Sequence, residues 1–133
     1  MAKKDVILLA DDDIDDAELL QEAIAIIAPY VEVAIVTDGK QVADFLAKCP
    51  DDELPAAVLL DYHMAQCDGP ELLLWICDHE RLVSIPKFVW GTPDEKTFGE
   101  KCKRFGATQY FVKPVDIRGV LHIANSVLAQ SGI

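Results

Sequence analysis

The sequence predicts a single α/β domain built on a doubly wound parallel sheet, and three observations support this prediction. The chain has 133 residues, of which 51% are hydrophobic, enough for one core of ordinary size. Short apolar segments of β type alternate along the chain with segments in which apolar residues recur at helical spacing. Most of the β-type segments are almost continuously apolar, as expected for strands buried on both faces of a parallel sheet.

Five strands and five helices are expected, in alternation. The strands are predicted at Val6–Ala10, Val31–Val36, Ala56–Leu60, Lys87–Trp90 and Gln109–Val112. The helices are marked by apolar stripes, which comprise Ile14, Ala17, Leu20, Ile24 and Ile27; Val42, Phe45, Leu46 and Cys49; Leu72, Leu73 and Ile76; Phe98, Cys102 and Phe105; and Ile117, Leu121, Ala124 and Leu128.

Residues at the predicted helix ends agree with this division. Asp68-Gly69-Pro70 opens the third helix, Gly106 ends the fourth, and Asp116 precedes the last as a candidate N-cap. Five strand–helix units are too few for an eight-stranded barrel. We therefore predict an open flavodoxin-like sheet with strand order 2-1-3-4-5 and helices on both faces.

The charge of the chain limits its partners. Asp and Glu number 23 against 12 Lys and Arg, a net charge of -11, which argues against nucleic acid or an anionic membrane as the main partner. The longest apolar runs, such as Ala23–Ala28, fall far short of the roughly 18 residues of a membrane span, and no signal peptide is recognisable. The four cysteines form no metal-binding or CxxC pattern, so we expect reduced thiols and a cytoplasmic location.

Polar residues follow the predicted strands at their carboxyl ends. Asp11 and Asp12 follow the first strand, Asp61 the third, Gly91 and Thr92 end the fourth, and Lys113 follows the fifth. In an open parallel sheet, ligands bind just beyond these ends. With strand order 2-1-3-4-5, the first and third strands are neighbours, so we expect their carboxylates to converge near the lysine.

Such a cluster of carboxylates favours cation binding. At about 5 Å and an effective dielectric near 20, each like-charge pair costs about 3 kcal/mol, so the site is either partly protonated or built for a cation. Oxygen ligands without thiolate or imidazole suit Mg²⁺ or Mn²⁺. One carboxylate could then accept a phosphoryl group, with Lys113 supplying positive charge. Taken alone, Asp13, Asp15 and Asp16 are expected to be N-cap and first-turn acids of a helix.

Four motifs in order resemble one known family. They are the acidic pair after Ile7-Leu8-Leu9-Ala10; Leu59-Leu60-Asp61-Tyr62-His63-Met64; Asp68-Gly69-Pro70-Glu71-Leu72-Leu73; and Gly106-Ala107-Thr108-Gln109-Tyr110-Phe111-Val112-Lys113-Pro114. Together they resemble the receiver domain of bacterial two-component response regulators, of the stand-alone kind found in chemotaxis. The resemblance covers essentially the whole chain.

The resemblance implies roles for the residues at the strand ends. Asp61 would be the phosphoacceptor, and Lys113 would bind the phosphoryl oxygens. Asp11, Asp12 and Asp61 would bind Mg²⁺ (or Mn²⁺), together with the backbone carbonyl of His63. The chain would be a phosphoacceptor signalling protein and not an enzyme, since it would assist only its own phosphorylation and dephosphorylation.

The switch residues of the family are matched only in part. Tyr110 resembles the switch aromatic, which turns inward on activation, but Gly91 stands where the family carries a Ser or Thr. A glycine has no hydroxyl that could hydrogen-bond the phosphoryl group. Two alternatives follow: the hydroxyl of the next residue, Thr92, replaces the missing one, or no hydroxyl does. Pro114 resembles a proline that often follows a cis peptide bond. We further hypothesise that His63 shields the phosphoryl group and tunes its hydrolysis; the alternative is an exposed histidine without a role.

The predicted function is that of a single receiver domain spanning residues 1–133, with no output domain. Its upstream partner would be a histidine kinase or phosphotransfer protein, and an unknown protein effector would read its state, with no binding to nucleic acid. Two alternatives remain open. Gly91 favours a pseudo-receiver, an interaction module that does not use phosphorylation. Asp11-x-Asp13 also imitates the motif of haloacid dehalogenase-like phosphatases, with Asp11 as nucleophile and Asp13 as acid/base.

Overall fold

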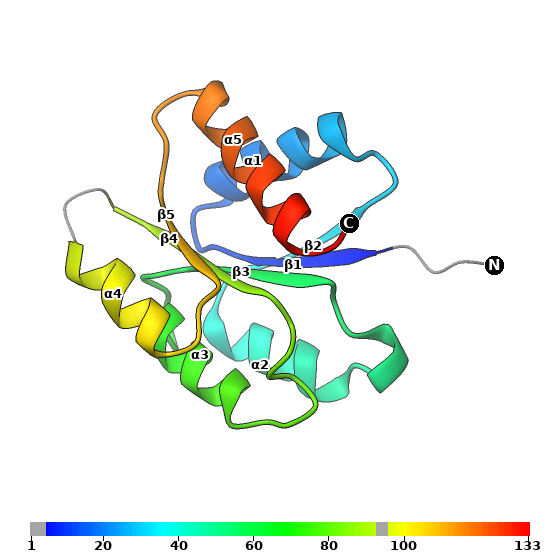
Figure 1. Ribbon diagram of the computed structural model, residues 1–133, viewed down its shortest axis with the longest axis vertical. Helices are drawn as coiled ribbons and strands as arrows, with labels where there is room; N and C mark the ends of the chain where they lie inside the picture. The colour runs from blue at the N-terminus through cyan, green and yellow to red at the C-terminus, as the bar shows by residue number, and fades with distance from the viewer. Residues whose placement is uncertain (1–4, 93–95) are drawn as a thin grey trace.

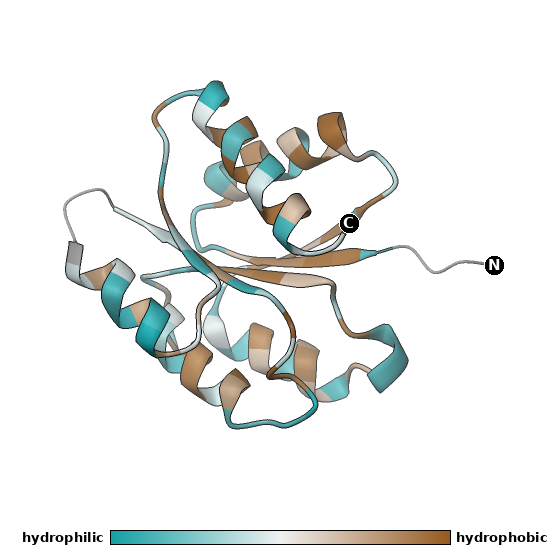
Figure 2. Cartoon of the chain, in the orientation of Figure 1, coloured by the Kyte–Doolittle hydropathy of each residue, from teal (hydrophilic) through white to brown (hydrophobic). Residues whose placement is uncertain are grey.

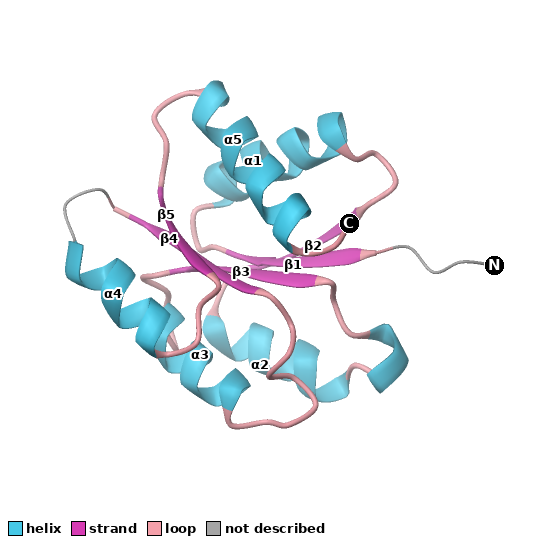
Figure 3. Cartoon of the chain, viewed as in Figure 1, coloured by secondary structure: helices cyan, strands magenta, loops and turns pink. Residues whose placement is uncertain are grey.

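A parallel sheet of five strands forms the centre of the molecule (Figures 1 and 3). In the computed structural model, which describes residues 5–92 and 96–133, the order is β2-β1-β3-β4-β5, which confirms the prediction. The strands are β1 (Val6–Ala10), β2 (Glu32–Val36), β3 (Ala57–Asp61), β4 (Lys87–Gly91) and β5 (Gln109–Val112). Every neighbouring pair of strands runs parallel.

Two strands extend one residue further than predicted, and both extensions bear on the site. Asp61 is the last residue of β3, in register with Trp90, and the N–H of the next residue donates to the Trp90 carbonyl. Gly91 is the last residue of β4, in register with Val112 of β5. The ladder continues there because the next backbone N–H groups still find carbonyl partners on the neighbouring strand.

Helices cover both faces of the sheet (Figure 1). They are α1 (Ile14–Ile27), α2 (Gly39–Lys48), α3 (Gly69–Cys77), α4 (Lys96–Arg104) and α5 (Ile117–Gln130), with a short 3₁₀ helix, η1, at Asp51–Glu53. Helices α1 and α5 lie on one face, and α2, α3 and α4 on the other. This is the doubly wound arrangement that the alternating sequence predicts.

The hydrophobic core is divided by the sheet into two layers. Successive side chains of a strand point to opposite faces, so Ile7 and Leu9 of β1 pack under α1 and α5, while Leu8 and Ala10 pack under the other three helices. All four are essentially inaccessible to solvent. Figure 2 shows the resulting apolar colouring along the central strands. Burial on both faces explains why the strands are almost continuously apolar in sequence.

Local hydrogen bonds fix where the helices begin and end. Asp13, Asp38, Asp68 and Asp116 cap α1, α2, α3 and α5, each accepting a backbone N–H of the first turn, as predicted for Asp13 and Asp116. At the end of α4, Gly106 has a φ of +105°, and the N–H of Ala107 donates to the Cys102 carbonyl at 2.9 Å. These contacts form a Schellman motif, for which glycine is favoured.

In the part of the chain that the structure describes, every helix is too short or too polar to cross a membrane. The four cysteines form no disulfide among the described residues, and Cys102, which belongs to α4, is buried.

Candidate functional site

The predicted convergence of polar residues at the carboxyl edge of the sheet is present. Asp11 directly follows β1, Asp61 ends the adjacent strand β3, and Lys113 follows β5. One carboxylate oxygen from each of Asp11, Asp12 and Asp61 lies within 4.8 Å of the others. The sheet order produces this cluster, since β1 and β3 are neighbours although 50 residues separate the two buried aspartates along the chain.

The two buried aspartates have different surroundings. Asp11 is fully buried, and its Oδ1 accepts the N–H of Asp13 at 2.9 Å, while its Oδ2 forms an ion pair of 2.9 Å with Lys113 Nζ. Asp61 is 5% exposed, and its Oδ1 accepts the N–H of His63 at 3.4 Å, while its Oδ2 lies 3.5 Å from the same Nζ. Asp12 is exposed. The lysine is therefore closer to Asp11 than to Asp61.

The electrostatics of the pocket act strongly on Asp61. Burial, followed by the hydrogen bond and the negative charge of Asp11, raises the pKa of Asp61 from 3.8 to about 8 in the absence of a cation. Lys113 and the N–H of His63 act in the opposite direction but do not compensate. Without a cation, Asp61 therefore holds a proton at neutral pH.

Lys113 has contacts beyond the carboxylates that were predicted to lie near it. Its Nζ donates a hydrogen bond of 3.0 Å to Oδ2 of Asp16 in the first turn of α1, and it lies 5.1 Å from the centre of the Trp90 ring. Burial alone would lower the pKa of Lys113, but the carboxylates of Asp11, Asp16 and Asp61 outweigh it and raise that pKa. The lysine is therefore charged throughout the physiological range.

Sequence reasoning assigned Asp16 only to the helix start and Trp90 only to a strand. The position of Asp16 in the first turn after the Asp13 cap could have indicated it, because the helix begins right beside Asp11. For Trp90, the period of two along β4 could have placed it on the α1 and α5 face. The contact of either side chain with Lys113 depends on the fold.

The donor set fits a divalent cation. Three carboxylates offer only oxygen ligands, which hard cations prefer. In addition, Oδ2 of Asp11 is fully buried and accepts no hydrogen bond among the described residues, although it lies in ion-pair distance of Lys113. A cation would satisfy this oxygen and relieve the repulsion between the acids.

The residues predicted to act as a switch, Gly91, Thr92 and Tyr110, form a second region beside the pocket. Tyr110 is half-buried, and its hydroxyl donates to the Thr92 carbonyl at 3.3 Å. A Cβ atom placed on Gly91 would lie 2.6 Å from the Tyr110 hydroxyl, so the tyrosine occupies space that any other residue at 91 would need. On the other side, a Cβ atom on Gly99 would lie 3.6 Å from Cδ1 of the same ring. Tyr110 is therefore seated between two glycines.

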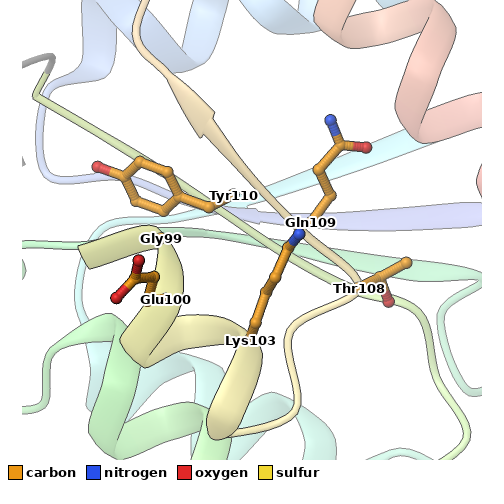
Figure 4. Close-up of a pocket in the computed structure, with 6 residues that line it drawn as sticks. All are labelled: Gly99, Glu100, Lys103, Thr108, Gln109 and Tyr110. Atoms are coloured by element: carbon orange, nitrogen blue, oxygen red, sulfur yellow. The ribbon is translucent and has the colours of Figure 1, made fainter. Parts of the chain in front are cut away.

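Figure 4 shows Tyr110 projecting from β5 across α4, next to Gly99. The backbone oxygen of Thr92 accepts this hydrogen bond from Tyr110, and Thr92 itself is exposed beyond the end of β4.

An aromatic cluster connects the pocket to α4. Tyr62, which follows Asp61, stacks on Phe98 of α4 with ring centres 3.8 Å apart. The exposed ring of His63 makes edge contacts with both of these rings; its centre lies 4.8 Å from the centre of the Tyr62 ring and 5.5 Å from that of the Phe98 ring. Sequence reasoning placed Phe98 only in the apolar stripe of the helix. It also stacks on the residue next to the predicted phosphoacceptor.

One expectation from the resemblance is wrong. No cis peptide bond occurs among the described residues, so the bond preceding Pro114 is trans.

Comparison with known proteins agrees with this geometry. Residues 7–125 match the family model of the response regulator receiver domain. The chain is 28% identical over 96 residues to the two-component response regulator ORR5 of Oryza sativa subsp. japonica, covering 72% of this chain and 69% of ORR5. It is 30% identical over 112 residues to the probable methanogenesis regulatory protein FilR2 of Methanothrix harundinacea, covering 83% of this chain and 72% of FilR2.

Solved structures show the same fold. The phosphorylated cyanobacterial phytochrome response regulator RcpA superposes with a TM-score of 0.84 at 25% identity, covering 95% of this chain and 92% of RcpA. The Mn²⁺-bound form of the response regulator Rcp1 gives a TM-score of 0.81 at 24% identity, covering 94% and 92%. The chain belongs to the response regulator receiver domain family, the phosphoacceptor proteins of two-component signalling.

Proposed function

We propose that Asp61 accepts a phosphoryl group from a phosphohistidine donor and that Lys113 holds the phosphoryl oxygens afterwards. One observation carries this proposal: carboxylates from two adjacent strands converge on a single lysine at the carboxyl edge of the sheet. The metal would be Mg²⁺ (or Mn²⁺), held by Asp11, Asp12, Asp61 and the carbonyl of His63. The fit of the donor set and the Mn²⁺-bound form of Rcp1, which has the same fold, support this assignment.

The transfer step follows from these positions. An Asp61 carboxylate oxygen attacks phosphorus, the new P–O bond forms as the P–N bond of phosphohistidine breaks, and the imidazole leaves with the bonding electron pair and takes up a proton. Mg²⁺, when bound, supplies positive charge for the carboxylates and for the transferring phosphoryl oxygens. The Lys113 ammonium, 3.5 Å from Asp61, is within reach of a phosphoryl oxygen attached there.

The pKa of Asp61 explains why a cation is needed. A protonated carboxyl group is a poor nucleophile, and Asp61 holds its proton at neutral pH in the metal-free protein. Positive charge beside Asp61 favours loss of that proton, so the same cation that balances the charge also prepares the acceptor.

We further propose that the phosphorylation state is read by a protein effector at the surface formed by α4, β5 and α5, with Tyr110 as the switch aromatic. Gly91 offers no hydroxyl to the phosphoryl group, and the Thr92 hydroxyl would have to replace it. The close packing of Tyr110 against Gly91 supports a second candidate function. This is a pseudo-receiver, in which the surface that the effector binds has the same conformation without phosphorylation.

The upstream partner in this proposal is a histidine kinase or a phosphotransfer protein, since receiver domains are phosphorylated by histidine kinases. The reaction would take place in the cytoplasm, where the four cysteine thiols would stay reduced.

The geometry gives no support to the phosphatase alternative. A nucleophilic Asp11 would need an accessible oxygen, but its side chain is fully buried between the Asp13 N–H and Lys113. Asp13, the acid/base of that alternative, serves instead as the cap of α1, where its Oδ1 accepts the N–H groups of Asp15 and Asp16.

Intact mass after incubation with Mg²⁺ and acetyl phosphate tests the acceptor. Wild type is expected to gain one phosphoryl group, Asp61→Asn none, and the matched control Asp15→Asn, which removes a carboxylate from the nearby first turn of α1, the same as wild type. Uptake by Asp61→Asn would contradict the assignment. If wild type gains nothing from acetyl phosphate or from a phosphohistidine donor, the pseudo-receiver is the correct description.

A second measurement tests the cation. Mg²⁺ that binds only the folded chain stabilises it by mass action and so raises the melting temperature. At a Mg²⁺ concentration about a hundred times Kd, the free energy of unfolding increases by about 2.7 kcal/mol. We expect this increase in wild type and Asp15→Asn and its loss in Asp12→Asn. An unchanged melting temperature of wild type up to about 10 mM Mg²⁺ would contradict the site.

A further inference from the structure

A third carboxylate holds Lys113 from outside the acidic cluster. Oδ2 of Asp16 accepts a hydrogen bond of 3.0 Å from Lys113 Nζ, almost as short as the 2.9 Å ion pair with Asp11 and shorter than the 3.5 Å contact with Asp61. The family resemblance gives Asp16 no role, and its position in the sequence predicts only an acidic residue in the first turn of α1. Its side chain is 35% exposed, so its position beside the lysine is not forced by burial.

The fold holds the Asp16 carboxylate in place. The Asp16 N–H donates to the Asp13 cap, so the residue is fixed in the first turn of α1. The next residue, Ala17, is fully buried and anchors this turn on the sheet. A contact between residues 97 positions apart in sequence is thus made by two rigid elements, a capped helix start and a strand end.

The direction in which the ammonium is drawn follows from the distances. Asp11 and Asp16 hold Nζ closer than Asp61 does, and the Trp90 ring lies 5.1 Å from it. To reach a phosphoryl group on Asp61, the lysine has to exchange one of these carboxylates for a phosphoryl oxygen. Asp11 is fully buried and is also a candidate cation ligand, whereas Asp16 is partly exposed and can be solvated when released.

We propose that Asp16 is a positioning residue that holds the Lys113 ammonium toward α1 in the unphosphorylated chain and competes for it with the phosphoryl oxygens on Asp61. This inference rests on the proposed function of Asp61 and adds to it a residue that sets how strongly the phosphorylated state is favoured.

Titration with beryllium fluoride in the presence of saturating Mg²⁺ tests the competition, because this anion imitates a phosphoryl group on an aspartate. Asp16→Asn is expected to bind it about fivefold more tightly than wild type, since the competing charged partner is lost. Asp15→Asn removes the same charge from the same turn without a contact to the lysine and is expected to stay within about twofold of wild type. Asp16→Glu keeps the charge and is expected to fall between wild type and Asp16→Asn.

Each other result is decisive. If Asp16→Asn and Asp15→Asn are alike, Asp16 is a solvated first-turn acid and the inference is wrong. If Asp16→Asn binds more weakly, Asp16 presents the lysine to the phosphoryl group and does not compete for it. If wild type binds no beryllium fluoride with Mg²⁺, the proposed function of Asp61 fails, and the competition fails with it.

A double-mutant cycle separates the contact from the phosphoryl chemistry. Free energies of unfolding of wild type, Asp16→Asn, Lys113→Met and the double variant, without metal or phosphodonor, report the coupling of the two side chains. The cycle is expected to show favourable coupling, and the corresponding cycle of Asp15→Asn with Lys113→Met none. Additive effects in the Asp16 cycle would overturn the inference even where Asp61 is phosphorylated normally.

Discussion

The acidic pocket and the seat of Tyr110 lie beside each other at the same sheet edge but are built by different means. In the pocket, ion pairs and hydrogen bonds hold charged side chains that lie at the ends of β1, β3 and β5 and in the first turn of α1. At Tyr110, the decisive feature is a missing side chain: Gly91 leaves the space that the tyrosine hydroxyl approaches. In the proposed function, uptake of a phosphoryl group and reading of the phosphorylated state would therefore depend on separate residues, and one could change while the other is retained.

The two regions also differ in what perturbs them. The pocket is expected to respond to protons and cations, because burial and the neighbouring Asp11 raise the pKa of Asp61 and three carboxylates lie close together. The tyrosine seat responds to volume, because close contacts with two glycines define it. Variants that change charge without volume, or volume without charge, should therefore separate the two.

The largest effect is expected from pH on the metal-free protein. The pKa of Asp61 is about 8 in the folded chain and 3.8 for the unperturbed side chain, so between these pH values the folded chain binds a proton that the unfolded chain has lost. The contribution of Asp61 to the free energy of unfolding is therefore fully present below pH 3.8 and is lost as pH rises to about 8, by up to about 1.4 kcal/mol per pH unit. Denaturant unfolding in EDTA at intervals from about pH 5 to about pH 8 measures this slope.

Asp61→Asn should remove most of that slope and be more stable than wild type at the alkaline end, while Asp15→Asn should keep it. A wild-type stability that stays constant or rises over this interval would show that burial and Asp11 do not raise the pKa of Asp61 in the folded chain.

The next largest effect is expected from Lys113→Met. Loss of the ammonium leaves the buried Asp11 carboxylate without its charged partner, which should lower the free energy of unfolding by about 3 kcal/mol and slow phosphorylation by about a hundredfold. Lys87→Met is the matched control, because Lys87 is also buried, with Nζ donating to the carbonyls of Val83 and Ile85. It should lower stability but leave phosphorylation by acetyl phosphate intact. Equal loss of phosphorylation in both variants would contradict a specific role of Lys113.

A smaller effect is expected at the tyrosine seat. Gly91→Ala places a methyl group 2.6 Å from the Tyr110 hydroxyl and 3.1 Å from Cβ of Tyr62, so the tyrosine ring must shift, at a cost of about 1 to 2 kcal/mol. Gly99→Ala meets the same ring at an ordinary 3.6 Å and should stabilise α4 by up to about 1 kcal/mol. NMR shifts of the Tyr110 ring and thermal unfolding distinguish the two.

Combining Gly91→Ala with Tyr110→Phe removes the clashing hydroxyl and should recover part of the lost stability. Phosphorylation should be unchanged throughout this series. A strong loss of phosphoryl uptake in Gly91→Ala would show that the two regions are not independent.

The smallest effect is expected from His63→Ala. The exposed His63 ring lies against Tyr62 and Phe98 next to the acceptor, so its removal should admit water and speed loss of the phosphoryl group about twofold to fivefold. Decay of the phosphorylated mass after removal of acetyl phosphate measures the rate. His79→Ala, whose ring packs on Trp75 outside the pocket, is the control. An unchanged rate in His63→Ala would make His63 an exposed histidine without a role.

The pocket was more predictable from sequence than the tyrosine seat, for a physical reason. Strand ends are marked in sequence, and parallel strands all end at one edge, so Asp11, Asp61 and Lys113 could be brought together without coordinates. The confirmed strand order then follows from the fold class. What sequence could not provide was the ranking of distances around Lys113, because those depend on how the first turn of α1 sits on the sheet.

The role of Gly91 was visible in sequence only as an absence. Tyr110 occupies the space beside Gly91 because of how α4 packs against β5. Neither the apolar periodicity of the sequence nor the motif that contains Tyr110 predicts this packing. Likewise, Phe98 belongs to an apolar stripe in sequence, and only the fold stacks it on Tyr62.

The burial of Trp90 has a practical consequence. Its indole is 1% exposed and lies 5.1 Å from the Lys113 ammonium, so its fluorescence should respond when that charge moves or a cation enters beside it. The other tryptophan, Trp75 of α3, packs against His79, which lies just beyond the end of that helix, and offers an internal reference. The protein thus contains its own optical probe, with which occupancy of the pocket can be followed in real time without any attached label.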